Sequence, residues 1–285
     1  MDKLTQVSTA TFSLFGQSIT VNPMVFYMTW VVMGLIIVFA LYLSRRLTMI
    51  PSSIQSLFES VYEFLEEITI STLGKKDGAR YVPFIVSIFV FILLSNWIGI
   101  VPNILSLLGS VFAFFHWLAG DAQVSFVYEG LTQMSFQISD PRWFNFLLSF
   151  PGFEEPTKSV NTDLALALLV FFVVQAYGIQ KKGFLTYIRS FADDPFPMKG
   201  PLILLFFLNP FFYLNILGLV ASVVSHAFRL FGNIFGGAMI IVIVSSLLKY
   251  VLVPVGLFAF FGLFAGIVQA FVFTMLAVTY IQQQQ

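Results

Sequence analysis

The sequence predicts an all-α integral membrane protein, because it is rich in apolar residues and poor in charge, and because its charges are confined to short clusters. Of the 285 residues, 58% are hydrophobic and 10% are charged, whereas about 25% of the residues in an ordinary soluble domain are charged. This composition excludes a soluble globular enzyme, a disordered chain and a nucleic-acid binder. The absence of Cys excludes disulfides and Cys-ligated metals, and we expect no cofactor and no metal site.

Long uncharged runs predict about five membrane helices within a single membrane domain, residues 1–285, because about 20 apolar residues cross a bilayer. The predicted spans are residues 24–44, 82–101 and 161–180, a long helix over 203–249 that is bent or in two pieces, and a last helix over 254–280. The last two would form a long C-terminal helical hairpin. The segment 102–160 between the second and third spans is predicted to be an interfacial or external insert.

Residues 52–72 predict one amphipathic helix in addition to the spans. Their apolar side chains recur at helical spacing, and four glutamates occupy the other side. Such a helix lies on the membrane surface, or its acidic face is a docking surface for a partner.

The distribution of basic residues predicts the orientation. Lysines and arginines gather in the loops 45–80 and 181–199, whereas residues 119–160 contain few. The positive-inside rule places both basic loops in the cytoplasm. The N-terminus and the insert would then lie outside, and the C-terminus inside.

Arg229 is the most informative residue, because 29 uncharged residues precede it and 19 follow it. A guanidinium stays protonated, and at the centre of a bilayer it costs at least about 2.5–3.5 kcal/mol. Such a residue marks a functional site by default. The last 85 residues contain no carboxylate, so a counter-charge must come from elsewhere in the chain or from another subunit. This favours an oligomeric, ion-translocating assembly.

Small and polar residues extend the site along one face of the same helix. They recur at steps of three and four and are Asn215, Gly218, Ser222, Ser225, Arg229, Gly232 and Gly236. Asn233 and His226 flank this stripe, one turn on either side of Arg229. An imidazole titrates in the physiological range, so His226 is either a titratable group of an ion pathway or a neutral packing side chain.

The last helix carries a matching face formed by Gly262, Gly266 and Gln269. The amide of Gln269 needs a hydrogen-bond partner in hydrocarbon. The stripe around Arg229 could supply that partner, so we expect the two helices to pair.

Several of these segments resemble subunit a of F-type ATP synthases. RLFGNIFGG (229–237) followed by VQAFVFTMLAVTYI (268–281) is similar to that family's C-terminal hairpin. Upstream, SNWIGIVPN (95–103), VNTDLALAL (160–168) and YGIQKKG (177–183) resemble its earlier spans in the same order. RLFGN suggests a bacterial protein, and hence a multi-pass protein of the bacterial inner membrane.

The resemblance implies a non-catalytic stator subunit that passes ions through two aqueous half-channels to and from a c-ring. It implies that Arg229 faces the ring and separates the half-channels, that Gln269 lies beside it, and that Asn233 and Asn161 match two family asparagines. The implied partners are the c-ring, peripheral-stalk b subunits and membrane lipid. The transported ion would be H⁺, with Na⁺ left open, since its ligands lie on the c-ring.

The sequence departs from this pattern where family members often carry ionisable residues. Ala238, Gly262 and Asn215 occupy three such positions. Two other functions remain as alternatives. One is a secondary transporter with its substrate site at Arg229, which should show internal repeats. The other is a structural membrane scaffold, which leaves Arg229 unexplained.

Overall fold

The computed structural model describes residues 10–14, 17–101, 104–121, 124–129, 133–138, 153–193, 210–248, 256–257 and 259–285. The chain forms two compact units. The first unit comprises residues 1–35, 93–158 and 233–267, and the second unit comprises residues 36–92, 159–232 and 268–285. Each unit is described by itself below.

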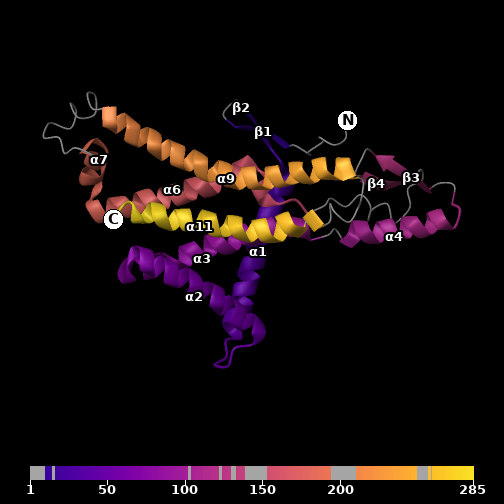
Figure 1. The fold of residues 1–285 in the computed structure, drawn as a ribbon, viewed down its shortest axis with the longest axis horizontal. Coiled ribbons are helices and arrows are strands. Elements are labelled where there is room, and N and C mark those ends of the chain that lie inside the picture. The colour runs from indigo at the N-terminus through magenta and orange to yellow at the C-terminus, as the bar shows by residue number, and fades with distance from the viewer. Residues whose placement is uncertain are drawn as a thin grey trace. The chain divides into compact units, whose positions relative to one another are not determined.

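The described residues include five helices that are long and apolar enough to cross a membrane, which confirms the predicted fold class. They are α1 (Pro23–Arg45), α3 (Lys75–Trp97) with a 3-10 turn (Ile98–Ile100), α6 (Val160–Lys182), α9 (Pro210–Leu248), and α11 (Gly266–Gln282) with a preceding π-helical turn (Phe260–Ala265) (Figure 1). The predicted residues 203–209, 249, 254–255 and 258 lie outside the described residues. Within its described part, the long helix predicted as bent or in two pieces is a single helix and not two pieces.

The predicted amphipathic helix is α2 (Ser53–Leu73). The Ser52 side chain accepts a hydrogen bond from the backbone N–H of Gln55 and caps its N-terminus. Gly74 ends the helix with φ of 80°, a left-handed conformation that glycine adopts without strain. Phe64 of α2 stacks on Phe271 of α11 at 5.9 Å between ring centroids, so one side of α2 packs against α11 within the second unit.

Helix α3 begins at Lys75, earlier than the predicted span 82–101, because the polar residues at its start are paired. Asp77 accepts a hydrogen bond from the Tyr177 hydroxyl at 3.0 Å and forms an ion pair with Lys181 of α6 at 2.7 Å. These contacts fix the start of α3 to the end of α6. The sequence pattern could not reveal this pairing, because the partners are distant in the chain.

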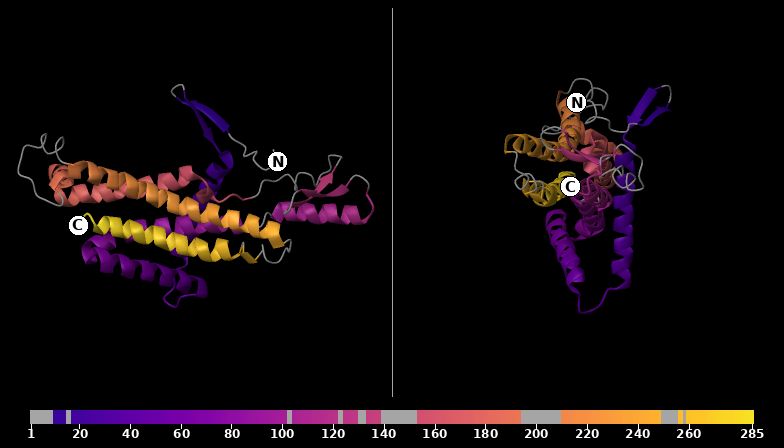
Figure 2. Two further views of the ribbon diagram at one scale, coloured as in Figure 1. Left: turned by 45° about the horizontal axis from the view of Figure 1, so that its top comes forward. Right: turned by 90° about the vertical axis from the view of Figure 1, so that its right-hand side faces the viewer.

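The segments outside the predicted spans contain additional elements. The insert includes α4 (Ile104–Leu118) and an antiparallel hairpin of β3 (Val124–Glu129) and β4 (Gln133–Ile138), which lie side by side in Figures 1 and 2. A second hairpin, β1 (Ala10–Leu14) with β2 (Gln17–Val21), precedes α1, and α7 (Phe184–Asp193) follows α6. The two small hairpins add strands to an otherwise helical protein.

Candidate functional site

Arg229 lies on an uncovered face of α9. It is exposed, as is Gly232 of the same stripe, whereas Gly218 of the stripe lines a cavity described below. A Cβ atom built on Gly218, Gly232 or Gly236 would meet nothing within 4 Å. Within the described part of the chain, no carboxylate forms an ion pair with Arg229. Among the described residues, nothing pairs with the guanidinium on this face.

The opposite face of α9 is packed inside the second unit. Leu230 is fully buried, and Ala227 and His226 are each 2% exposed. The change from buried to exposed therefore occurs between adjacent residues around Arg229. Packing on one face holds the helix in place and leaves the guanidinium on the other.

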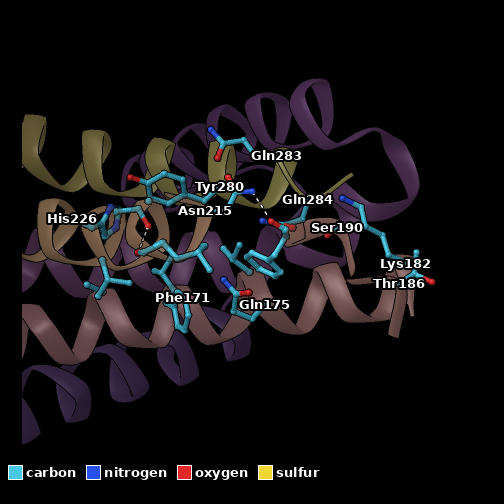
Figure 3. A pocket seen from close by; sticks show the side chains of 18 residues that line it. Phe171, Gln175, Lys182, Thr186, Ser190, Asn215, His226, Tyr280, Gln283 and Gln284 are labelled. Atoms are coloured by element: carbon cyan, nitrogen blue, oxygen red, sulfur yellow. Dashed lines mark hydrogen bonds between the residues drawn. The ribbon is translucent and has the colours of Figure 1, made fainter. Parts of the chain in front are cut away.

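A cavity of about 740 Å³ lies in the second unit, between α6, α7, the first half of α9 and the C-terminal residues. Figure 3 shows His226 and Tyr280 at one end of the cavity and Lys182 and Thr186 at the other. Gln175 also lines it. The cavity thus extends from the end of α6 to the turn of α9 that precedes Arg229, and its polar lining can hold water.

His226 is buried without a hydrogen-bond partner for either ring nitrogen among the described residues. Its ring contacts those of Phe273, at 3.7 Å between centroids, and Tyr280, at 5.6 Å. Buried polar atoms are normally satisfied by protein or ordered water. Because His226 lines the cavity, water there can satisfy its nitrogens.

Two other predicted site residues line the same cavity. Asn215 donates a hydrogen bond from Nδ2 to the backbone oxygen of Phe191 at 2.8 Å, which joins α9 to α7. The Ser222 hydroxyl donates to the Leu219 oxygen of its own helix at 2.7 Å. Asn215 therefore positions the cavity wall, and Ser222 presents its hydroxyl oxygen to the cavity.

A second cavity, of about 250 Å³, lies in the first unit. Asn233 of α9, Asn96 of α3 and Gly262 line it, together with the segment 153–158 before α6. Asn233 donates a hydrogen bond to the Ala265 oxygen at 3.4 Å, so the second half of α9 does pair with the start of the last helix. The titratable residues lining this cavity are Glu154, Glu155 and Lys158.

Buried hydrogen bonds hold the wall of this cavity together. The Thr157 hydroxyl donates to Asn96 Oδ1 at 2.7 Å, and Asn96 Nδ2 donates to the Gly266 oxygen at 3.2 Å. Asn22 donates to Glu154 at 3.0 Å. Segments that are far apart in the sequence are thus fixed around one polar space.

The remaining predicted residues line neither cavity. Asn161 and Ser225 are exposed. Gln269 is 6% exposed, and its Nε2 atom has no hydrogen-bond partner among the described residues. Its amide nitrogen therefore does not make the expected bond to the stripe around Arg229.

Two of the departures, Ala238 and Gly262, share a location, and one of them has a steric context. Both residues line the first-unit cavity. A Cβ atom on Gly262 would meet the side chain of Ile100 at 2.5 Å. An ionisable side chain at this position would therefore displace Ile100.

Two buried or half-buried carboxylates were not predicted as site residues. Asp163 of α6 is fully buried, and neither of its oxygens has a hydrogen-bond partner among the described residues. The sequence feature that could have indicated it is a single acidic residue within an otherwise apolar run. Glu155 has no such signal, because it lies in a mixed polar segment. Among the described residues, no group of three or more His, Cys, Asp or Glu could hold a metal ion.

Comparisons with known proteins identify relatives over most of the chain. Residues 26–282 match the family model described as ATP synthase A chain. Proteins named ATP synthase subunit a are 30% identical in Moorella thermoacetica, over 89% of this chain and 86% of the relative, and 29% identical in Trichlorobacter lovleyi, over 89% and 84%. The Desulforamulus reducens protein of that name is 27% identical over 93% of this chain and 80% of the relative.

The family match covers the helix with Arg229, the last helix and all lining residues of the two cavities except Gln283 and Gln284, and the five apolar helices fit a membrane-embedded subunit. The chain therefore belongs to the ATP synthase A chain family and is a non-catalytic, ion-channel stator subunit of an F-type ATP synthase.

Proposed function

We propose that the two cavities are the inner ends of two aqueous half-channels and that Arg229 separates them. The main support for this proposal is the order of three residues along α9. His226 lines the second-unit cavity, Asn233 lines the first-unit cavity, and Arg229 comes between them in α9. Ions reach carboxylates of a c-ring through one cavity and leave through the other.

The exposed face of α9 is the surface that the c-ring occupies in this proposal. The guanidinium favours the ionised form of a ring carboxylate beside it, because a nearby opposite charge lowers a carboxyl pKa. It also opposes direct passage of a cation between the cavities. Rotation of the ring is then the easier path for the ion, and the exposed glycines allow the ring helices to approach closely.

Gln269, Asn161 and Ser225 have supporting roles in this proposal. Gln269 lies in the C-terminal helix that pairs with α9, where its buried amide can hydrogen-bond water. Ser225 belongs to the uncovered stripe, and Asn161 is at the exposed start of α6. Peripheral-stalk b subunits and lipid cover other exposed apolar surfaces, such as α1, in which Val38 and Ile37 are 66% and 59% exposed.

The ends of the helices support the predicted sidedness. Asp77 and Lys181 pair between the two basic loops, and Gln285 Nε2 donates to the Leu73 oxygen at 2.8 Å, so these loops and the C-terminus lie together in the second unit. In the first unit, the Asn22–Glu154 hydrogen bond joins the start of α1 to the insert. With the positive-inside rule, we place the basic loops and the C-terminus in the bacterial cytoplasm, and the start of α1 and the insert outside.

Single Cys substitutions should report this orientation. A membrane-impermeant thiol reagent should modify Lys76→Cys and Lys182→Cys only from the cytoplasmic side, and Glu129→Cys only from outside. The chain has no native Cys, so the cysteine introduced is the chain's only thiol. Modification of Glu129→Cys from the cytoplasm would contradict the assignment.

Cysteines inside the cavities should test the half-channels themselves. Small water-soluble thiol reagents should reach Ser222→Cys from the cytoplasm and Ile241→Cys from outside, because these residues line different cavities. Val220 and Ile240 are exposed apolar residues of α9 that line neither cavity. Their Cys variants are matched controls and should react slowly from both sides. Equal reactivity of Ser222→Cys and Val220→Cys would argue against a water-filled cavity.

A further inference from the structure

We propose that Glu155 is the proton-carrying group of the first-unit cavity, accepting a proton from water in the cavity and releasing it toward Asn233. The proposal rests on the proposed function of this cavity as a half-channel and assigns its titratable group. No covalent bond other than the O–H bond forms or breaks, and the proton leaves through water to the next acceptor.

The Glu155 side chain occupies space that is free because residue 99 is a glycine. A Cβ atom on Gly99 would overlap Glu155 Cγ and Oε1, so the carboxylate occupies the space that any other residue at position 99 would fill. Gly99, Glu155 and Asn233 all line the cavity. The carboxylate therefore reaches the cavity from the segment before α6, against the end of α3.

The backbone around Glu155 is fixed. The Glu155 oxygen accepts a hydrogen bond from the Lys158 N–H at 3.0 Å, which closes a short 3-10 turn. Within this turn, the buried hydroxyl of Thr157 bonds Asn96. The turn is therefore closed by its own backbone and anchored to α3 through Thr157, which holds the backbone of Glu155 beside the cavity.

The other lining residues leave Glu155 as the carboxylate available for proton transfer. Glu154 already accepts a hydrogen bond from Asn22 at 3.0 Å. Lys158 is cationic and exposed. The lining residues from α3, α9 and the last helix are not titratable, and they include Ala238 and Gly262.

The electrostatic environment of Glu155 favours its protonated form. Burial raises the pKa of Glu155, and the positive charge of Lys158 opposes part of that rise. A raised pKa keeps the proton bound to a higher pH than on an exposed glutamate. A catalytic or carrier group transfers protons best when its pKa lies near the working pH. As pH rises through this raised pKa, the protonated fraction falls, and proton loading falls with it.

The test uses membrane vesicles that contain the whole ATP synthase. Glu155→Gln keeps the size of the side chain but cannot carry a proton, so ATP-driven proton pumping and ATP synthesis should fall at least about tenfold. Passive proton flux through vesicles stripped of the soluble head should fall similarly and lose its decline with rising pH. Glu59→Gln on α2 lies in neither cavity and serves as the control, with activity near that of the parent.

Moving the carboxylate from position 155 to position 99 distinguishes a role in proton transfer from a structural role of the Glu155 side chain. Glu155→Ala empties the space opposite position 99, and Gly99→Asp then returns a carboxylate to it from α3. The double variant should recover much of the flux that Glu155→Ala loses, whereas Gly99→Asn with Glu155→Ala should not. Retention of this chain and the c-ring in the purified complex checks assembly.

The outcomes distinguish this inference from the proposed function. Normal pumping in Glu155→Gln, with pumping abolished in Arg229→Ala, would overturn the role of Glu155 alone. Equal rescue by Gly99→Asp and Gly99→Asn would also overturn it, since the space and not the proton would then matter. Normal pumping in Arg229→Ala would overturn the half-channel proposal on which both depend.

Discussion

Arg229→Ala is expected to reduce ATP synthesis to background while passive ion leak persists or rises. In the proposed function, the substitution removes the fixed charge that separates the two half-channels. Arg229 lies in α9 between His226, which lines one cavity, and Asn233, which lines the other. Without this charge, an ion can pass between the half-channels without rotation of the ring. ATP synthesis and passive flux are measured in the same vesicles, so the loss of coupling is seen directly.

Two variants sharpen this experiment. Arg229→Lys should also be impaired, because Lys lacks the planar guanidinium and can lose its proton when buried. Phe228, which is 57% exposed beside Arg229, provides the control Phe228→Leu, which should retain most synthesis. Near-normal synthesis in Arg229→Ala would refute the role of the arginine.

His226 should give the second large effect. Its ring packs against Phe273, and both of its nitrogens lack partners among the described residues. His226→Phe keeps an aromatic ring in this place but removes both polar atoms, so we expect ion transport to fall at least about tenfold. The measurement is ATP-driven pumping in vesicles with matched amounts of assembled complex.

His226→Gln completes the comparison. Gln can hydrogen-bond water in the cavity but cannot titrate near neutral pH. Transport that survives in Gln but not in Phe would assign a hydrogen-bonding role, and loss in both would assign proton transfer. Full transport in His226→Phe would leave only the packing role.

The spans could be predicted from the sequence because each depends on a local property, an uncharged apolar run. The predicted span 24–44 corresponds to α1, and the predicted amphipathic helix to α2. The structured insert could not be predicted in the same way. Strands β3 and β4 are short, and their alternating pattern becomes meaningful only when they pair with each other and lie beside α4.

The part of the candidate site around Arg229 could be predicted from the sequence, because a single charge within an apolar run is visible there. Arg229 stands out in any apolar run, and the steps of three and four place small residues beside it. The role proposed for Glu155 could not be predicted, because its place opposite Gly99 is a contact between segments far apart in the sequence. The distribution of His226 and Asn233 between two cavities likewise depends on which helices pack against each half of α9.

The continuity of α9 has a consequence for its inclination in the bilayer. Leu214 and Leu247, near its two ends, are 57% and 74% exposed, so both ends belong in an apolar phase. At 1.5 Å per residue, they are about 50 Å apart along the axis, whereas the hydrocarbon core is about 30 Å thick. A straight helix with both of these ends in hydrocarbon leans more than about 50° from the membrane normal, against an average of about 20° for transmembrane helices. A helix so oblique changes depth slowly along its length, which keeps Arg229 and its neighbours on either side within the low-dielectric middle of the bilayer.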